Sequence, residues 1–404
     1  MDAMNMSSVA WVMTSTALVM VMLPGLSLFY SGLVRGKNAL ATAMHSFTCL
    51  GIVLIVWVLW GYSLAFGPSV GGIIGNLDHI ALNGVGLEPR EGQEIPELLF
   101  MLFQGMFAVI TPALLAGAIA ERVKFRAFGA FVVLWVTFVY CPIAHWVWGG
   151  GWLHELGASD FAGGFAVHMS SGVAALAAAR ILGRRDIKDG ETAPQPHSLM
   201  IVLLGTGFLW FGWFGFNGGS ALAADGIAVI ALVNTNVAAA AGALTWLLLT
   251  WHLAKKPSVL GAASGAIAGL VGVTPAAGYV EVIPALIIGI GASVVSYLAA
   301  ESRIKAMVDD ALDVWAIHGM AGTWGSVALG VFASTTLAAG GLLSGNGDFF
   351  IAQVVSTIAT WIFAFVVTWV IFRVIEAAIG LRPTPEEEAL GLDAAEHGET
   401  AYMF

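Results

Sequence analysis

Long apolar stretches, each nearly free of charge, recur along the chain and restrict its fold more than any other feature. Residues 40–66, for example, contain no Asp, Glu, Lys or Arg. A helix needs about 20 mainly apolar residues to cross a bilayer. Hydrophobic residues make up 58% of the chain and charged residues only 10%, which excludes a soluble globular fold. The sequence therefore predicts an all-α polytopic membrane protein.

The apolar stretches predict eleven transmembrane helices, whose ends are defined only to within several residues. The predicted spans are residues 9–30, 40–66, 98–120, 127–146, 161–182, 198–216, 227–252, 258–274, 282–300, 314–332 and 350–377. Ten or twelve spans remain alternatives, because a weak span rich in Gly and Ala, such as 258–274, is easily miscounted.

The basic residues indicate how this bundle is oriented. Of the 16 Lys and Arg residues, all except Arg90 lie in or beside alternate loops, namely 31–39, 121–126, 183–197, 253–257, 301–313 and the tail from 378. Cytoplasmic loops carry an excess of Lys and Arg. We therefore expect the N-terminus outside the cell and the C-terminus in the cytoplasm. The other set of loops includes an acidic segment, 78–97, whose role the sequence leaves open.

Composition and motifs exclude several other classes of protein. A net charge of −10 without a basic stripe argues against nucleic-acid binding. Cys49 and Cys141 lie in separate apolar stretches and form neither a disulfide framework nor a zinc motif. The zinc signatures HExxH and HxxEH do not occur in the sequence. We expect no enzymatic activity, no metal and no cofactor.

Two histidines lie where a bilayer penalises polar groups, and they occupy corresponding positions. His168 lies in the fifth predicted span, eight residues after Asp160, and His318 lies in the tenth, five residues after Asp313. Each therefore belongs to the last helix of a five-helix group. Because five is odd, the second group enters the membrane from the opposite side, which predicts an inverted repeat with a site near the midplane. A helix–helix hydrogen bond explains one buried histidine, whereas a symmetric pair favours a functional site.

Aromatic side chains gather toward one end of the predicted bundle. Phe103 and Phe107 are four residues apart and share a helix face. Trp148 ends the fourth span, and Phe216 and Ser220 lie at the end of the sixth. An interfacial aromatic belt is the alternative for any one of these rings. Their π faces also suit a small cation.

Short motifs follow one another in a distinctive order along nearly the whole chain. They are Pro24-Gly25-Leu26, Phe29-Tyr30, Arg35-Gly36-Lys37-Asn38, Ala120-Glu121-Arg122, Ala144-His145-Trp146, Trp148-Gly149-Gly150-Gly151, Asp160-Phe161-Ala162-Gly163-Gly164, Gly212-Trp213-Phe214-Gly215-Phe216-Asn217, Thr274-Pro275-Ala276-Ala277-Gly278, Trp315-Ala316-Ile317-His318-Gly319, Gly391-Leu392-Asp393, His397-Gly398-Glu399 and Ala401-Tyr402. In this order and topology the chain resembles the ammonium transporter (Amt/Rh) family, on its Amt side.

The resemblance implies a homotrimer with one pore in each subunit, and it implies roles for individual residues. The outer site that recruits ammonium is expected to contain Phe107, Trp148 and Ser220, with Phe103 beside them. The remaining roles are a gate (Phe107, Phe216), a pore with proton relay (His168, His318), pore lining (Trp213, Leu114, Val314) and electrostatic support of the recruitment site (Asp160).

The implied activity is ammonium transport into the cytoplasm. NH₄⁺ binds at the outer aromatic site, loses its proton and crosses the hydrophobic pore as NH₃, while the histidines relay the proton separately. Whether methylammonium also passes is left open. Two alternatives remain, a passive channel for NH₃ or CO₂ and an ammonium sensor.

Two parts of the chain are distinguished by polarity. Residues 1–380 are the predicted transmembrane domain, and residues 381–404 are a predicted cytoplasmic regulatory tail. The resemblance rests there on Gly391, Asp393, His397, Gly398 and Tyr402. It implies a docked segment and a PII-type signalling protein as partner, whereas solvated disorder is the alternative. The expected location is the plasma or inner membrane of the cell.

Overall fold

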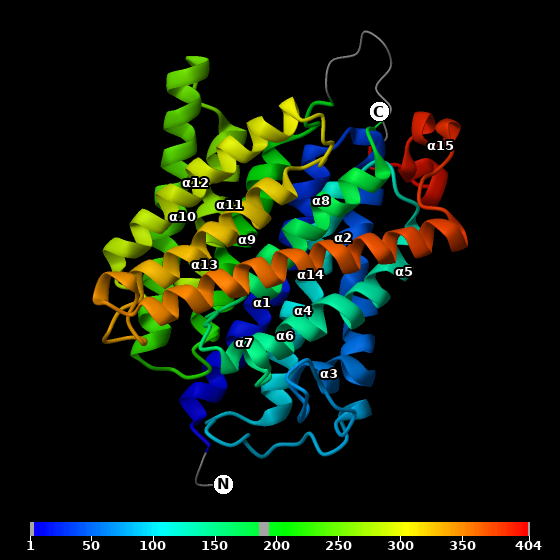
Figure 1. The fold of residues 1–404 in the computed structure, drawn as a ribbon. Coiled ribbons are helices and arrows are strands. Elements are labelled where there is room, and N and C mark those ends of the chain that lie inside the picture. Colours follow the sequence, from blue (N-terminus) through cyan, green and yellow to red (C-terminus); the bar gives the residue numbers. More distant parts are fainter. Residues whose placement is uncertain (1–3, 186–193, 403–404) are drawn as a thin grey trace.

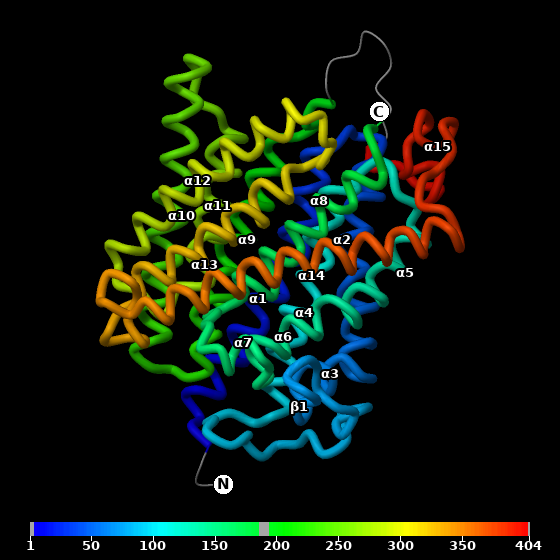
Figure 2. The backbone as a smooth tube through the Cα atoms, viewed as in Figure 1, coloured from blue at the N-terminus to red at the C-terminus, as the bar shows by residue number. Residues whose placement is uncertain are grey.

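The structure, a computed structural model, describes residues 4–185 and 194–402 and is a bundle of helices (Figure 1). The middle of the predicted loop 183–197, including Lys188, and the last two residues of the predicted tail lie outside the described residues. The backbone trace shows long helices that cross the molecule, joined by shorter connections at both ends (Figure 2).

The helices of the first half follow the predicted spans closely. They are α1 (Met6–Leu33), α2 (Ala39–Val56), α3 (Tyr62–Phe66), α4 (Glu97–Ile119), α5 (Phe125–Trp135), α6 (Cys141–Trp148), α7 (Trp152–Glu155) and α8 (Ser170–Leu182). Short π-helical turns join α2 to α3, join α5 to α6 and precede α8, namely η2 (Trp57–Gly61), η4 (Val136–Tyr140) and η5 (Gly164–Met169). Single 3₁₀ turns are η1 (Gly36–Asn38) and η3 (Ile80–Leu82).

The second half has the same character. Its α-helices are α9 (Leu199–Gly219), α10 (Gly226–Ala254), α11 (Val259–Val273), α12 (Val282–Lys305), α13 (Ala321–Phe332), α14 (Gly347–Ile379) and α15 (Pro385–Leu390). Its short turns are η6 (Thr274–Ala276), η7 (Trp315–Met320), η8 (Leu342–Ser344) and η9 (Asp393–His397). The long helix α14 runs across the face of the bundle and packs on α8, α13 and α5 (Figure 1).

One small sheet departs from the all-α prediction. Strands β1 (Ser69–Val70) and β2 (Ile74–Gly75) pair antiparallel in the register Ser69↔Gly75 and Val70↔Ile74. Gly71 and Gly72, which adopt positive φ angles of 61° and 74°, make the turn between them. The hairpin belongs to the connection between α3 and α4 and leaves the helical core unchanged.

Ten helical segments among the described residues are long and apolar enough to cross a membrane. They are Met6–Leu33, Gly36–Phe66, Glu97–Ile119, Phe125–Glu155, Gly164–Leu182, Leu199–Gly219, Gly226–Ala254, Val259–Ala276, Val282–Lys305 and Gly347–Ile379. The chain is therefore a multi-pass membrane protein. The predicted span 314–332 is helical as η7 and α13 but is not one of the ten, and it carries His318, Thr323 and Ser326 among its glycines. The count of eleven stays a prediction.

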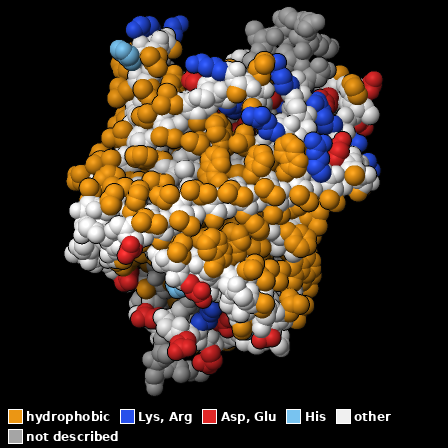
Figure 3. Space-filling model, viewed as in Figure 1, with side chains coloured by type: hydrophobic (Ala, Val, Ile, Leu, Met, Phe, Trp, Pro, Cys, Tyr) orange, Lys and Arg blue, Asp and Glu red, His pale blue; other side chains and the backbone are white. Residues whose placement is uncertain are grey.

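The surface divides into a hydrophobic belt and two charged ends (Figure 3). Acidic side chains gather at the end with the β-hairpin and the start of α1, which we call the acidic end. Lys and Arg side chains gather at the opposite end, beside α15, which we call the basic end. Between them, large apolar side chains such as Leu244, Ile362 and Val366 are more than half exposed, at 60%, 61% and 52%.

Small residues let the first half of the chain pack tightly against the second. A Cβ atom added at Gly205 of α9 would lie 2.4 Å from the backbone nitrogen of Phe29 in α1. One added at Gly25 of α1 would lie 2.8 Å from the Cβ of Phe208. Only glycine permits this spacing, as in the small-residue contacts of other membrane helices.

A buried ion cluster holds the basic end together. The Arg122 guanidinium is 0% exposed and donates to the Asp309 carboxylate at 2.7 Å. Arg185 joins the cluster through Asp309 at 2.9 Å and Glu121 at 3.4 Å, and Arg35 contacts Glu121 at 3.1 Å. A buried charge is tolerated only when it is paired in this way. The cluster ties together the segments after α1, α4, α8 and α12.

Pairing in this cluster shifts the pKa values of both carboxyls. Burial acts to raise the pKa of Asp309, but the hydrogen bond from Arg185 and the charge of Arg122 outweigh it and lower that pKa from 3.8 to about 2. For Glu121, burial again acts to raise the pKa, and Arg35 and Arg185 lower it overall. Both carboxylates therefore stay ionised at neutral pH.

The predicted tail is ordered and docked on the basic end over its described residues. The Asp393 carboxylate accepts the backbone N–H groups of Ala41 at 2.8 Å and Leu40 at 3.1 Å. The backbone N–H of Leu392 donates to Asn38 Oδ1 at 2.8 Å. Further along, the Tyr402 hydroxyl lies 2.8 Å from Nε2 of His197. Solvated disorder is thus wrong for residues 381–402.

We predict that Asp309 makes the basic end acid-sensitive. Because its pKa is lower in the folded protein than the ordinary 3.8, its contribution to stability is complete above about pH 4 and is lost as the pH falls through about 2. The shift corresponds to about 2 kcal/mol. The apparent melting temperature in detergent should fall more steeply over this range for the wild type than for Asp309→Asn. Glu386→Gln, at an exposed glutamate of α15, is the control and should follow the wild type.

Candidate functional site

Two histidine rings meet in the interior of the bundle. Nδ1 of His168, in η5, lies 3.3 Å from Nδ1 of His318, in η7, and both side chains are buried. The rings are nearly parallel, with centroids 5.4 Å apart and planes inclined by 25°. Two Nδ1 atoms at this separation share one proton, so one ring donates and the other accepts. Nε2 of His168 is buried and has no hydrogen-bond partner among the described residues.

A carboxylate caps the helix that carries His168. The Asp160 carboxylate accepts the backbone N–H groups of Gly163, Gly164 and Phe165 at 2.8, 2.6 and 2.7 Å, and that of Ala166 at 3.4 Å. These are the amides at the start of a helix, which have no partner within it. Asp160 is buried, so the cap lets η5 and α8 begin inside the protein. This geometry shows a structural role for Asp160, and its electrostatic support of the recruitment site stays a prediction.

Asp310, and not Asp313, is the counterpart of Asp160 in the second half, which corrects the match made from the sequence. Asp310 Oδ2 accepts the backbone N–H of Trp315, five residues on, as Asp160 Oδ2 accepts that of Phe165. His318 follows Asp310 by eight residues, the same spacing as between Asp160 and His168. That equal spacing was the signal available in the sequence.

The environments of the two carboxyls explain this difference. Asp313 points to the basic end, where it pairs with Arg303 at 2.6 Å. Burial raises the pKa of Asp310 to about 6, and Arg303 opposes the shift. Burial also raises the pKa of Asp313, against the charge of Arg303. Asp310 is the buried carboxyl that begins the helix carrying His318, whereas Asp313 belongs to the charged surface of the basic end.

Glycines at the crossing point bring the two histidine helices together. A Cβ added at Gly172 of α8 would lie 2.0 Å from the backbone nitrogen of Gly319. One added at Gly322 of α13 would lie 3.2 Å from the Cβ of His168. The backbones therefore touch directly at this point, and the histidine contact depends on that approach.

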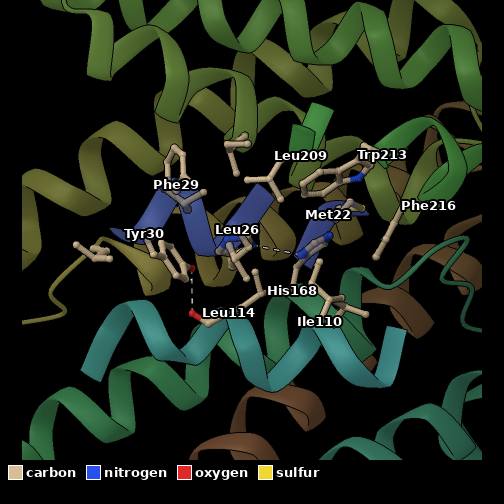
Figure 4. Close-up of a pocket in the computed structure, with 15 residues that line it drawn as sticks. Met22, Leu26, Phe29, Tyr30, Ile110, Leu114, His168, Leu209, Trp213 and Phe216 are labelled. Atoms are coloured by element: carbon tan, nitrogen blue, oxygen red, sulfur yellow. Dashed lines mark hydrogen bonds between the residues drawn. The ribbon is translucent and has the colours of Figure 1, made fainter. Parts of the chain in front are cut away.

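The histidines line a narrow central cavity with a volume of only about 20 Å³ (Figure 4). The other residues of its wall are apolar or aromatic: Met22, Leu26, Phe29, Tyr30, Ile110, Leu114, Val167, Leu209, Trp213, Phe216, Ile267, Leu312 and Ile317. The polar groups of Tyr30 and Trp213 are engaged elsewhere, with the Leu114 carbonyl and the Thr274 hydroxyl, both at 2.9 Å. A molecule inside the cavity therefore contacts only apolar or aromatic surface and two imidazole rings.

Two of the three residues predicted to line this pore do so. Leu114 and Trp213 belong to the cavity wall. Val314 does not, because its side chain is buried against Gly117 of α4, where an added Cβ would lie 2.7 Å from Val314 Cγ2. Tyr30 and Leu312, which were not predicted from the sequence to line the pore, belong to the cavity wall.

Two stacked rings separate the central cavity from a wider vestibule at the acidic end. The centroids of Phe107 and Phe216 lie 4.2 Å apart, with their planes inclined by 33°. Phe216 belongs to the central cavity and Phe107 to the vestibule. The two rings are therefore in contact at the boundary between these two spaces.

The acidic-end vestibule has a volume of about 450 Å³ and contains most of the predicted recruitment residues. Phe107, Trp148, Ser220 and Asp160 all line it. The indole N–H of Trp148 donates to the Asp160 backbone carbonyl at 2.8 Å, which fixes the ring against Phe107. The Ser220 hydroxyl donates to the Phe216 carbonyl at 2.8 Å, which leaves its oxygen free to accept a hydrogen bond.

Phe103 is placed differently from the other predicted recruitment residues. Its ring is 0% exposed and lies behind Phe107, with centroids 5.0 Å apart. It lines neither the vestibule nor the central cavity. Helical spacing put Phe103 and Phe107 on one face, but their separation along the helix axis puts only Phe107 at the cavity.

A third space continues the central cavity toward the basic end. This basic-end vestibule has a volume of about 340 Å³ and shares Phe29, Leu312 and Ile317 with the central cavity. Arg303 and Asp313 are among its other wall residues. The three spaces therefore adjoin in order, from the acidic end through the histidines to the basic end. Within the described residues no cluster of His, Cys, Asp and Glu has the arrangement of a metal site.

The chain is a multi-pass helical bundle around a buried apolar cavity. This architecture is that of a membrane transport protein. The family model described as Ammonium Transporter Family matches residues 10–402. The chain belongs to that family.

Relatives and solved structures agree over almost the full length. The chain is 52% identical to an ammonium transporter of Bacillus subtilis (strain 168) over 405 residues, covering 99% of each. Among crystal structures, it is similar to Mep2 of Saccharomyces cerevisiae, with a TM-score of 0.92 and 38% identity over 99% of this chain and 92% of the other. It is also similar to a structure titled "Sensor Amt Protein", with a TM-score of 0.90 and 32% identity over 97% and 98% of the two chains.

We predict that removing the Asp310 cap destabilises the protein more than removing the Asp313 charge. Asp310→Ala leaves the buried Trp315 amide without an acceptor, which costs about 1–3 kcal/mol. Asp313→Asn breaks an ion pair whose carboxylate is 33% exposed, worth about 1 kcal/mol or less. Asparagine is chosen there because it tolerates the φ of 60° at this position.

Thermal unfolding in detergent measures both effects. Asp310→Asn keeps an acceptor for the Trp315 amide and should recover most of the stability lost in Asp310→Ala. If Asp313→Asn lowered the stability as much as Asp310→Ala, the conclusion that Asp310 is the structural counterpart of Asp160 would be wrong.

Proposed function

We propose that this chain is an ammonium transporter of the plasma or inner membrane, which conducts NH₃ past the two histidines and passes the proton separately. The observation that carries the proposal is the His168–His318 pair, hydrogen-bonded inside an otherwise apolar cavity. The family and its named transporters support ammonium as the substrate and argue against an enzyme.

We propose eleven transmembrane helices, with the N-terminus outside and the basic end in the cytoplasm. The helix from Trp315 to Phe332, which is the tenth in chain order, counts as a span in addition to the ten segments. The excess of Lys and Arg at the basic end supports this orientation (Figure 3). The matching Asp–His spacings and helix caps support an inverted repeat of spans 1–5 and 6–10.

The proposed recruitment step takes place in the acidic-end vestibule. Transfer of a small ion from water into a medium of low dielectric constant costs on the order of 20 kcal/mol by the idealised Born estimate. A desolvated cation–π contact returns about 2 kcal/mol. The faces of Trp148 and Phe107 and the free lone pair of Ser220 therefore hold NH₄⁺ at the mouth but do not pay for its passage.

The proposed deprotonation takes place at the phenylalanine gate. Beyond Phe107 and Phe216 the walls are apolar, so neutral NH₃ is the form of lowest energy there. Transient opening of the 4.2 Å ring stack admits it. Asp160 does not bind the ion directly in this proposal, because its carboxylate oxygens are occupied by backbone amides.

The histidine pair provides the proposed proton relay. The shared Nδ1–Nδ1 proton fixes complementary tautomers, so that protonation at one outer nitrogen and release at the other reverses both rings together. The partnerless Nε2 of His168 is available for the first of these transfers. Potassium has no proton to surrender and is excluded by the apolar wall.

Two other functions give different observable results. In a passive NH₃ or CO₂ channel the same cavity conducts gas without net charge. In an ammonium sensor the pathway conducts little, and the similarity to the structure titled "Sensor Amt Protein" is the observation that favours this reading.

We predict that ammonium transport depends on the two histidines. In proteoliposomes on a solid-supported membrane, an ammonium pulse should give a saturable positive current, whereas a potassium pulse should give none. His168→Ala combined with His318→Ala should remove the selectivity of the current or reduce the ammonium current about tenfold or more, which corresponds to a barrier raised by about 1.4 kcal/mol or more.

The matched control is His252→Ala, at an exposed histidine near the end of α10 that lines none of the three spaces. It should conduct as the wild type does. Internal alkalinisation without current would replace this proposal by a neutral gas channel. Neither current nor alkalinisation would favour the sensor.

We propose that the chain forms a homotrimer and that residues 381–404 are a cytoplasmic regulatory tail on a transmembrane domain of residues 1–380. The proposed partner at this face is a PII-type signalling protein. The motif residues Gly391, Asp393, His397, Gly398 and Tyr402 support a regulatory role, because the tail they belong to is docked against three helices of the transmembrane domain. Gly391, with a φ of 107°, approaches the backbone of Lys37 closely, where a Cβ would lie 2.6 Å from the carbonyl oxygen.

We predict that Asp393 holds the tail in place. Asp393→Ala removes the acceptor of the Leu40 and Ala41 amides. Hydrogen exchange over residues 385–402 should rise roughly tenfold or more for the loss of about 1.4 kcal/mol. Binding of a PII-type protein, followed by native mass spectrometry of the complex, should weaken in parallel. Glu399→Gln, at an exposed glutamate of the same segment, should leave both unchanged.

A further inference from the structure

A groove between α8 and α14 opens on the hydrophobic belt beside the basic end. It has a volume of about 770 Å³ and is open to the surroundings. Its walls are Leu176 and Arg180 of α8 and Phe365, Val366, Trp369 and Val370 of α14. In Figure 1, α14 passes over α8 at this place. None of these residues lines the transport path described above.

The floor and rim of the groove are suited to a hydrocarbon chain. Val366 and Val370 are 52% and 54% exposed and lie one helical turn apart. Leu176, Phe365 and Trp369 are half-buried beside them. This surface is part of the hydrophobic belt that would face lipid in a membrane (Figure 3).

Two cations lie at one end of this apolar surface without a counterion. Arg180 forms one wall of the groove, and Trp369 forms part of the other. The guanidinium carbon of Arg373 lies 5.2 Å from the Trp369 ring centroid. Neither arginine has an ion pair or a hydrogen bond with another described residue. The nearest carboxylate along α14, that of Glu376, accepts the backbone N–H of Leu381 instead.

These two arginines differ from the five arginines of the basic end that form ion pairs. Arg35, Arg122, Arg185, Arg303 and Arg382 each pair with a carboxylate of the chain. Arg180 and Arg373, which face outward, are the exceptions near the groove. Because a cation at the edge of an apolar medium is stabilised by an anion, an anion from outside the chain is the expected partner. Basic pockets between helices at the membrane surface bind anionic lipid headgroups.

We propose that the groove holds one anionic phospholipid. Its phosphate contacts Arg180 and Arg373, and an acyl chain lies over Val366, Val370 and Leu176, with Trp369 at the boundary between headgroup and chain. The charge of the arginines selects an anionic over a zwitterionic headgroup, and the groove selects a lipid over a free phosphate. The proposal goes beyond ammonium transport and requires only that the chain lies in a membrane.

The test is native mass spectrometry of the full-length protein in neutral detergent, titrated with phosphatidylglycerol or with phosphatidylcholine that has the same acyl chains. The wild type should bind phosphatidylglycerol about tenfold or more tightly than phosphatidylcholine. Arg180→Gln combined with Arg373→Gln should weaken the binding of phosphatidylglycerol about 30-fold and leave that of phosphatidylcholine unchanged.

A matched double variant controls for charge alone. Lys255→Gln with Lys256→Gln removes two exposed cations at the end of α10, away from the groove, and should bind phosphatidylglycerol as the wild type does. Val370→Trp fills the groove but keeps both arginines. It should weaken the binding of phosphatidylglycerol, as the arginine double variant does. Glycerol phosphate, which carries the headgroup charge without acyl chains, should not compete.

Several results would overturn the proposal. They are equal affinity for the two lipids, equal loss in the Arg and the Lys variants, no effect of Val370→Trp, or competition by glycerol phosphate, which would indicate an anion site without a lipid. A change in the number of subunits with unchanged lipid binding would identify the groove as a contact between copies of the chain. The melting temperature of each variant in phosphatidylcholine, which should match the wild type, separates these results from misfolding.

Discussion

The arrangement of the interior depends on carboxylates that cap helices beginning inside the protein. The first amides of a helix have no hydrogen-bond partner within it. In an apolar environment no water replaces that partner, so each unpaired amide costs free energy. The Asp160 carboxylate accepts three of these amides at 2.6–2.8 Å, so η5 and α8 begin well below the surface. Asp310 does the same for η7 through the Trp315 amide. Because both caps hold, His168 and His318 reach the same level and meet.

Much of this fold follows from local sequence. Spans of about 20 apolar residues predict membrane helices, because only a helix satisfies its own backbone in lipid. The positions of both histidines and the capping role of Asp160 follow from adjacent residues. The predicted span ends agree with the helices to within a few residues, as for 227–252 against Gly226–Ala254. The weak span 314–332 shows where local hydropathy becomes a poor guide, since its polar residues face the interior.

The remaining features depend on contacts that no local pattern reports. Asp313 corresponds to Asp160 in the sequence analysis because each precedes the histidine of its span, yet Asp313 pairs with Arg303 at the surface. Phe103 lies on the same face of α4 as Phe107 but at a different position along the helix axis. The docked tail depends on Asp393 meeting amides more than 350 residues away, at Leu40 and Ala41. The ion cluster joins Arg122 to Asp309, 187 residues apart along the chain, and it links four loops that composition alone described as basic.

The two mouths of the path carry charges of opposite sign. The wall of the acidic-end vestibule contains two acidic residues and one basic residue, namely Glu91, Asp160 and Arg90. The wall of the basic-end vestibule contains three basic and two acidic residues, namely Arg184, Arg185, Arg303, Asp309 and Asp313. A monovalent cation is therefore concentrated at one mouth and depleted at the other, even when its bulk concentrations are equal. This asymmetry favours the capture of a cation at the acidic end over its capture at the basic end, a bias that weakens as salt screens the fixed charges.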